Sequence, residues 1–421
     1  MKRSCAKFLL LGAVALLAGC YSHGESAPAP TGLAVAAGDG GATLSWNMDS
    51  GVTYWVWCAL GTSITVEEAS SAASPLGLQI KVNVSSPFVV SGLANGRDYA
   101  CTVNGRYNGG PGGPGSPSVT FVPRLAGASW SPGAALGTGN LRGVGYGASF
   151  FAVGDAGSIF TSADGKSWTT TTPVTTDNLH AAVYDGIYVV AGQNGTILTS
   201  FDALNWSKPT PATTNDLYAL ATNGSGAYVA VGQAGTLQYS SGTVAQTWIV
   251  AADSGTASDN LTGATYGTVP SGSQFVAVSD QGRVLTSRNG GASWTLATVS
   301  ATPLYAVTYG VDNTVTPYVG RFVAVGAAGT VLTSTDGATW IAQASLGVNT
   351  LRAITYGHQF VAVGDAGSVY TSADGLTWQP QVSGTTTQDL LAIAHSVYST
   401  ASSTAFGYSV VGSSGTNLAA Y

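Results

Sequence analysis

One short stretch recurs along the last two thirds of the chain and constrains its fold more than any other feature. Near copies run from Phe151 to Trp168, from Phe322 to Trp340 and from Phe360 to Trp378, and looser copies run from Tyr188 to Trp206, from Tyr228 to Trp248 and from Phe275 to Trp294. A unit this short cannot bury its own apolar face, so successive units must stack on one another. The sequence therefore predicts a repeat architecture.

A leucine opens each unit, and the spacing of these leucines gives the size of the repeat. They are Leu141, Leu179, Leu217, Leu261, Leu304, Leu351 and Leu390. Steps of 38 to 47 residues are typical of β-propeller blades, each of which is a sheet of four short strands. We expect a seven-bladed β-propeller over residues 128–421, with an open solenoid as the alternative.

The last unit lacks one strand, and the segment before the first unit can supply it. No tryptophan follows Leu390, whereas Trp130 stands ahead of the first unit without a blade of its own. Trp130 precedes Leu141 by 11 residues, within the 10 to 13 residues that separate the other tryptophans from their next leucines. Pairing this N-terminal strand with the last blade would close the ring and remove exposed sheet edges.

Composition favours an all-β chain and excludes one class of function. Only 8% of the residues are charged, against about 25% in an average domain, and 57 of the 421 residues are glycine. Such a chain suits many short strands joined by tight turns, and its 45% of hydrophobic residues are enough for a large core. A net charge of −6 offers no basic surface, so we expect no binding to nucleic acid.

Residues 31–123 show the alternating apolar pattern of a small β-sandwich. The run from Leu93 to Tyr99 resembles the turn and tyrosine corner of a fibronectin type III domain. Two cysteines, Cys58 and Cys101, point inward by the alternation on strands that we expect to pair. They would form either a disulfide or two buried free thiols.

The N-terminus has the features of a targeting segment. Three basic residues, Lys2, Arg3 and Lys7, precede an apolar run from Phe8 to Ala18 that is too short for a comfortable membrane span. We therefore expect a signal peptide over residues 1–19. The alternative is a chance match in a cytosolic protein.

The end of this segment, Leu17-Ala18-Gly19-Cys20, resembles the bacterial lipobox. That resemblance implies cleavage before Cys20 and lipidation of its side chain, with residues 20–30 as the lipidated cysteine and an extended tether. The protein would then be exported and held at a membrane by its lipid. Tyr21 rather than aspartate follows the cysteine, which by the enterobacterial sorting pattern implies the outer membrane and leaves the side of that membrane open.

Three units contain the pattern Ser-x-Asp-Gly-x-x-Trp, and others carry degenerate forms. In such a turn the aspartate accepts backbone N–H groups and the tryptophan covers the hairpin. The pattern resembles the Asp-box of sialidase-type propellers, and the longer repeat is similar to the propellers of the photosystem II assembly-factor family and its bacterial relatives. We expect its aspartates to organise turns, with catalysis or metal binding as the alternative; they are Asp164, Asp202, Asp336 and Asp374.

The sequence does not support an enzyme. Sialidases use an arginine triad, a tyrosine backed by a glutamate, and a free aspartate, but residues 128–421 contain no glutamate. The histidines of the repeats, His180, His358 and His395, stand in different units without ligand spacing. We therefore expect no catalytic residue, no metal site and no cofactor.

One set of residues could form a binding site. The residue after each opening leucine should lie at the mouth of the central channel, and these residues are Arg142, His180, Tyr218, Thr262, Tyr305, Arg352 and Leu391. Turns between the second and third strands should present Asp155 and Asp365 on the same face. A basic and aromatic arc of this kind suits a peptide or a sugar, and the alternative is an ordinary exposed rim.

Two functions remain at this stage. The first is a non-enzymatic, lipid-anchored platform of the cell envelope whose propeller binds an envelope protein or a glycan. The second is an exported carbohydrate-active enzyme of the sialidase-like propeller type. The absence of glutamate from the repeats favours the first function.

Overall fold

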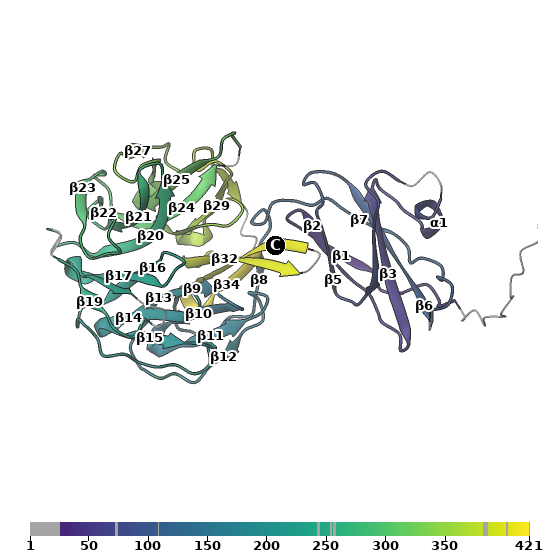
Figure 1. Cartoon of the computed structure of the whole chain (residues 1–421), viewed down its shortest axis with the longest axis horizontal. Helices are drawn as coiled ribbons and strands as arrows, with labels where there is room; N and C mark the ends of the chain where they lie inside the picture. The colour runs from purple at the N-terminus through teal and green to yellow at the C-terminus, as the bar shows by residue number, and fades with distance from the viewer. Residues whose placement is uncertain are drawn as a thin grey trace, which may run out of the picture. The chain divides into compact units, whose positions relative to one another are not determined.

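The computed structural model describes residues 26–71, 75–107, 109–241, 245–252, 255, 258–312, 314–381, 386–400 and 403–420. The expected signal peptide and the expected lipidation site at Cys20 lie outside these residues. The described chain is all-β apart from 3-10 turns and one short helix, α1 (Val66–Ala69) (Figure 1). None of its helices is long and apolar enough to cross a membrane.

The chain divides into two compact units. Of the described residues, those within 26–35, 44–88 and 98–121 form one unit, and those within 36–43, 89–97 and 122–420 form the other.

The strands of the N-terminal region form two sheets. The first has the order β4 (Gln79–Val84), β3 (Val52–Leu60), β6 (Tyr99–Tyr107) and β7 (Val119–Phe121), and the second has the order β1 (Ala34–Gly38), β2 (Gly41–Ser45) and β5 (Phe88–Ser91). Trp46, directly after β2, packs edge-on against the buried ring of Tyr54 in β3, with 5.7 Å between the ring centroids. Most of β3 and β6 is buried, including the continuous runs 56–59 and 99–105, so these two strands form the centre of the first sheet.

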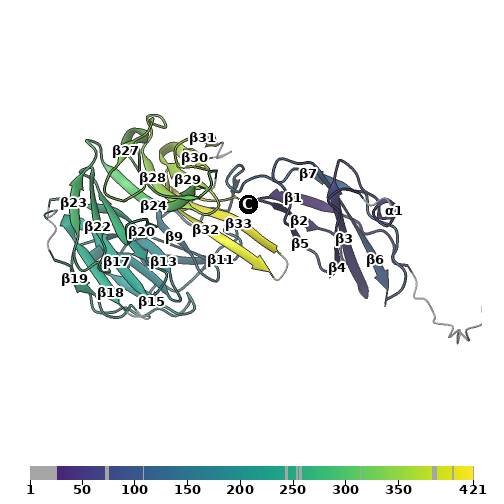
Figure 2. The same cartoon turned by 45° about the horizontal axis from the view of Figure 1, so that its top comes forward.

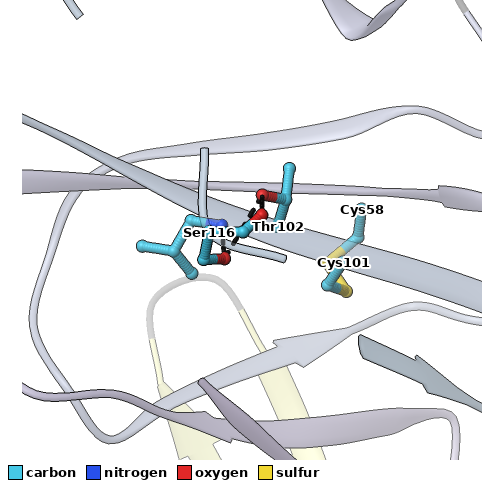
Figure 3. Close-up of a disulfide and its surroundings, with 5 residues drawn as sticks. Cys58, Cys101, Thr102 and Ser116 are labelled. Atoms are coloured by element: carbon cyan, nitrogen blue, oxygen red, sulfur yellow. Dashed lines mark hydrogen bonds between the residues drawn. A yellow bond between two sulfur atoms is a disulfide. The ribbon is translucent and has the colours of Figure 1, made fainter. Parts of the chain in front are cut away.

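Cys58 and Cys101 face each other across these two central strands. They are directly opposed in the β3–β6 ladder, both are buried, and their sulfur atoms form a disulfide with an S–S distance of 2.00 Å (Figure 3). The same strand β6 also holds Thr102, whose hydroxyl donates to the carbonyl of Ser116 at 2.8 Å.

Seven sheets follow one another in the described part of residues 131–420, and we number them sheet 1 to sheet 7. Sheet 1 consists of β9 (Leu141–Tyr146), β10 (Phe150–Gly154), β11 (Ile159–Ser162) and β12 (Thr169–Thr170), and sheet 2 consists of β13 (Leu179–Tyr184), β14 (Tyr188–Gly192) and β15 (Ile197–Ser200). Sheet 3 consists of β16 (Leu217–Thr222), β17 (Ala227–Gly232), β18 (Leu237–Ser241) and β19 (Ile249–Val250), sheet 4 of β20 (Leu261–Val269), β21 (Gly272–Ser279), β22 (Arg283–Ser287) and β23 (Thr295–Thr298), and sheet 5 of β24 (Leu304–Asp312), β25 (Val319–Gly326), β26 (Val331–Ser334) and β27 (Ile341–Ala342). Sheet 6 consists of β28 (Leu351–Tyr356), β29 (Phe360–Gly364), β30 (Val369–Ser372) and β31 (Gln379–Gln381), and sheet 7 of β32 (Leu390–Thr400), β33 (Ser403–Gly412), β34 (Asn417–Ala420) and β8 (Ser131–Pro132).

Sheet 7 combines the two ends of this region. Strand β8 pairs antiparallel with β34, so that Ser131 lies opposite Ala419 and Pro132 lies opposite Leu418. Trp130, next to β8, is buried in the same cluster as Tyr408 of β33. The segment before the first unit therefore supplies the fourth strand of the last sheet.

The first strands of the seven sheets contact one another in cyclic order. β9 lies beside β13, and the series continues through β16, β20, β24, β28 and β32 back to β9 (Figures 1 and 2). The second strand of each sheet is packed on both faces, as β29 shows. Phe360 and Ala362 join the cluster toward sheet 5, while Val361 and Val363 join the cluster toward sheet 7. This is why the recurrent Phe-Val-Ala-Val run contains no polar residue.

Sheet 2 departs from the expected four strands. Its fourth strand is reduced to a single bridge, in which Thr199 and Ser207 exchange backbone hydrogen bonds of 2.9 and 2.8 Å. Pro209 and Pro211 follow, and because proline has no backbone N–H the ladder cannot extend there.

Candidate ligand-binding site at the channel mouth

The residue after each opening leucine is the bulged residue of its strand. In sheet 3, Leu217 pairs with Gly232 and Ala219 pairs with Val231, so Tyr218 has no partner in the ladder. The same register shift occurs at this position in all seven sheets. A bulge redirects the side chain of the extra residue.

These seven side chains line one cavity of about 260 Å³. They are Arg142, His180, Tyr218, Thr262, Tyr305, Arg352 and Leu391, one from each sheet. The spacing of the sequence and the structure thus select the same residues. All of them are partly exposed.

Two arginines of this cavity are held by aspartates on neighbouring turns. Arg142 Nε donates to Asp155 Oδ1 at 2.6 Å, and Arg352 Nε donates to Asp365 Oδ1 at 2.7 Å. In both pairs the arginine side chain is 37% exposed. Arg352 Nη2 also donates to Asp365 Oδ2 at 3.2 Å, so within the described residues Nη1 of Arg352 and both terminal nitrogens of Arg142 remain open to a ligand. Burial alone would raise the pKa of Asp155, but the hydrogen bonds from Arg142 and from the backbone N–H of Asn140, together with the charge of Arg142, hold that pKa below its usual value.

The expectation of a basic arc needs correction. Each guanidinium is neutralised by a carboxylate of its own sheet, so the two positions carry ion pairs rather than free positive charge. The turn that holds each aspartate explains the pairing, because it folds back beside the bulge at the start of the first strand. The backbone N–H of Asn140, for example, donates to the second oxygen of Asp155 at 3.0 Å.

Aromatic rings complete the arc on both sides of the arginines. His180 stacks on Tyr218 with 5.5 Å between centroids, and the guanidinium of Arg352 lies 5.3 Å from the ring centroid of Tyr305. Burial, with a contribution from the charge of Arg142, lowers the pKa of His180, so the imidazole is neutral at pH 7. Its Nδ1 lies 3.2 Å from the carbonyl oxygen of Leu217 and must carry the proton there, which leaves Nε2 as an acceptor.

The floor of the mouth is apolar. Two residues beyond each bulge, the first strands contribute an apolar ring to the cavity, formed by Val144, Ala182, Leu220, Ala264, Val307, Ile354 and Ile393. A ligand at the mouth would therefore meet ion pairs and aromatic rings at the entrance and aliphatic side chains below.

The Asp-box aspartates lie elsewhere, at the turns after the third strands. Asp164 Oδ1 accepts from the backbone N–H of Ser167 at 2.7 Å and of Lys166 at 2.9 Å, and the Trp168 indole donates to the carbonyl of Gly165 at 3.1 Å. Asp202, Asp336 and Asp374 repeat this geometry. None of the four lines the mouth cavity. Among the described residues no cluster of three or more His, Cys, Asp or Glu could hold a metal ion.

A set of hydrogen bonds between neighbouring sheets was not predicted from the sequence. An Asn or Asp precedes the opening leucine in five units, and its side-chain oxygen accepts the backbone N–H of the central residue of the preceding sheet's 3-10 turn. The acceptors are Asn140, Asn178, Asp216, Asn260 and Asp389, and the donors are Ser414, Ala156, Asn194, Ala234 and Ala366 in the same order. The recurrent Asn or Asp was the available signal.

Successive antiparallel sheets whose first strands meet in a ring around a channel define a β-propeller. No family model and no curated protein matches the chain. Solved structures do match, and three of them support a β-propeller. YCF48, a photosystem II assembly factor solved bound to a D1 peptide, has 17% identity and a TM-score of 0.52 over 69% of this chain and 94% of that chain.

Two further structures agree. YCF48 from Cyanidioschyzon merolae has 16% identity and a TM-score of 0.52, covering 69% of this chain and 98% of its own, and the WD40 β-propeller domain of Doa1 has 10% identity and a TM-score of 0.50, covering 69% and 96%. At these identities the likeness shows the fold alone, and it confirms the β-propeller that the repeats predict.

Proposed function

We propose that the chain is a non-enzymatic binding platform whose channel mouth holds a segment of a partner polypeptide. The observation that carries this proposal is the single cavity lined by the residue after each opening leucine. The fixed Arg–Asp pairs offer donors and acceptors to a peptide backbone, the tyrosine rings offer flat surfaces, and the apolar floor can receive an aliphatic side chain.

One similar structure supports a polypeptide as the ligand class, because YCF48 was solved bound to a D1 peptide. An enzyme of the sialidase type is the weaker candidate. Three equivalent carboxylates stand at the turns beside the mouth, and each already has partners. Asp155 and Asp365 of sheets 1 and 6 are bound to arginines. Asp280 of sheet 4 accepts from the backbone and side-chain N–H groups of Asn260 at 3.0 and 2.9 Å. Each therefore comes from a different sheet and is held by its own partners, which leaves no carboxylate of this set free to act as a general acid or base.

The architecture proposed with this function is a fibronectin type III-like domain over residues 31–123, followed by a seven-bladed propeller over residues 128–421. The seven sheets, the cyclic contacts of their first strands and the β8–β34 pairing support the ring. The two N-terminal sheets support the sandwich.

Site-directed photo-crosslinking tests the binding proposal. Peptides are first selected from a random displayed library against the full chain purified in detergent. Benzoylphenylalanine is then placed at Leu391 in the mouth or at Phe201, which is 74% exposed on an Asp-box turn. We expect the selected peptides to crosslink from position 391 and not from position 201. Crosslinking from position 201 alone, or no enriched peptide, would reject the mouth as the site.

We also propose that the protein is exported and anchored by lipid on Cys20, with the outer membrane as its destination. The basic residues, the apolar run and the lipobox-like tetrapeptide follow one another in the order of a lipoprotein signal peptide, which supports this proposal. The variant Cys20→Ser should leave the membrane fraction and incorporate no labelled palmitate. Label in that variant would reject Cys20 as the attachment site.

A further inference from the structure

A second cavity opens from the other end of the same channel. It has a volume of about 500 Å³ and is lined by residues of all seven sheets, further along the first strands than the mouth. The apolar ring that floors the mouth also belongs to its lining. Its size falls in the range of about 300–1,000 Å³ that is usual for small-molecule sites.

The lining of this second cavity is uncharged. It contains no Asp, Glu, Lys or Arg, in contrast to the two Arg–Asp pairs at the mouth. A charged ligand would lose its hydration here without gaining an opposite charge. A neutral ligand is therefore the class that this cavity can hold.

Several hydroxyl groups of the lining are open to a ligand. Within the described residues, the hydroxyls of Thr265, Thr308 and Tyr266 make no hydrogen bond to the protein. The equivalent tyrosines of sheets 5 and 6 differ, because Tyr309 donates to the carbonyl of Thr268 and Tyr356 donates to that of Val311 at 2.7 Å. Those two tyrosines brace neighbouring sheets and do not line the cavity.

A histidine replaces the recurrent tyrosine in sheet 7. The position held by Tyr146, Tyr184 and Tyr266 in other sheets is His395, and its Nδ1 lies 3.2 Å from Thr355 Oγ1. Burial lowers the pKa of this imidazole, so it is neutral at pH 7. A neutral imidazole has one donor and one acceptor nitrogen and can bind a ligand hydroxyl in either direction.

Flat tyrosine rings lie beside these polar groups. Tyr184 of sheet 2 is 37% exposed, and Tyr266 of sheet 4 follows Thr265 in the chain; both tyrosines line the cavity. Hydroxyl groups that are both donors and acceptors, set next to aromatic rings and an apolar floor, match the alternating polar and C–H surfaces of a sugar ring.

We propose that this second cavity binds a small neutral saccharide through the hydroxyls of Thr265, Thr308 and Tyr266 and the imidazole of His395. The site is separate from the mouth and does not depend on the function proposed for it. A polypeptide at the mouth and a saccharide at the opposite opening could bind the same propeller.

Saturation-transfer NMR on the full chain in detergent tests this inference. The probes are glucose, galactose, N-acetylglucosamine and maltose, with glucuronate as the anionic counterpart. At least one neutral sugar should receive saturation, and glucuronate should receive none. No transfer to any neutral sugar, or transfer to glucuronate alone, would overturn the proposal.

Matched threonine variants locate the site. Thr308→Val removes a lining hydroxyl at nearly constant volume, and Thr295→Val does the same on the exposed outer strand β23. Thr308→Val should raise the dissociation constant of the bound sugar by about two- to tenfold, as the loss of one hydrogen bond implies, whereas Thr295→Val should not change it. His395→Tyr, which restores the residue of the other sheets, is the second variant should Thr308→Val fail to fold. Unchanged binding in a folded lining variant would overturn the proposal.

Discussion

The backbone N–H of Ser414 donates to Asn140 Oδ1 at 3.2 Å and joins two residues that lie 274 positions apart. The bond has the geometry of the Asn and Asp contacts between other successive sheets, so sheet 7 meets sheet 1 as other neighbours meet. Two backbone bonds reinforce it, from Gly415 to the carbonyl of Gly139 at 2.8 Å and from Leu136 to the carbonyl of Gly415 at 2.9 Å. The ring thus depends on residues 131–140, which precede the first unit.

Gly133→Ala should weaken this junction. A Cβ at Gly133 would lie 1.9 Å from Asn417 Oδ1 and 2.7 Å from the carbonyl oxygen of Lys166. Both distances are shorter than van der Waals contact, so the added methyl group would clash with these atoms. We expect the free energy of unfolding to fall by about 1–3 kcal/mol in urea titrations. Gly139→Ala is the control, because its nearest neighbour would be Asp155 Cβ at 3.5 Å. Equal losses in the two variants would contradict closure of the ring at this junction.

Asp336→Ala should destabilise an Asp-box turn, whereas Asp336→Asn should not. The alanine leaves the N–H groups of Ala338 and Thr339 without the Oδ1 acceptor that they now meet at 2.8 and 2.7 Å. Sheet 4 already uses Asn289 in this place, where its Oδ1 accepts from the N–H of Ser293 at 3.0 Å. We expect the alanine to cost about 1 kcal/mol in chemical denaturation. A loss of the same size in the asparagine variant would show that charge, not geometry, matters.

The stability of the propeller should fall in acid, partly through Asp336. Burial would raise its pKa, but hydrogen bonds from the N–H groups of Thr339 and Ala338 and from the Ser334 hydroxyl lower that pKa to about 2, from 3.8 in an unfolded chain. A carboxylate with a lowered pKa stabilises the fold above pH 3.8 and loses that effect as pH falls toward 2. Asp336→Asn should therefore show a shallower loss of stability between pH 4.5 and about 2. If the parent and the Asp336→Asn variant lose stability identically with pH, Asp336 does not contribute to the acid sensitivity.

Cys58→Ala combined with Cys101→Ala should lower the stability of the N-terminal sheets. The disulfide closes a loop with a sequence separation of 43 residues, for which chain entropy implies about 4 kcal/mol, and measured losses run from about 2 to 5 kcal/mol. Alanine is chosen because both thiols are buried and a serine hydroxyl would lack a partner. Calorimetry should show an earlier transition in the double variant, and reductant should not shift it further. An unchanged first transition would mean that the bond contributes little.

Much of the fold could be predicted because the same pattern of residues recurs in each unit of the chain. Each opening leucine is buried, and each following residue occupies the same bulge, so counting along the sequence was enough to collect the seven residues of the mouth. What the sequence could not give depends on register between strands. Whether Arg142 stays free or meets Asp155 is decided by how the turn at Asp155 folds back on β9, and no periodicity encodes that.

The loss of the fourth strand in sheet 2 was hidden for a related reason. Trp206 is present there as in the other units, and its indole still donates to the carbonyl of Ala203 at 3.1 Å. The tryptophan therefore reports the turn rather than the strand after it. The prolines that follow, Pro209 and Pro211, were the better signal.

The affinity of a selected peptide for paired variants tests the central claim most directly. Arg142→Ala with Arg352→Ala should raise its dissociation constant at least about tenfold, because two charge-assisted contacts are lost, while the melting temperature stays close to that of the parent. Asp164→Ala with Asp374→Ala should lower the melting temperature and leave the affinity unchanged, since those carboxylates hold turns away from the mouth. Parental affinity in a folded arginine variant would contradict a binding site at the channel mouth.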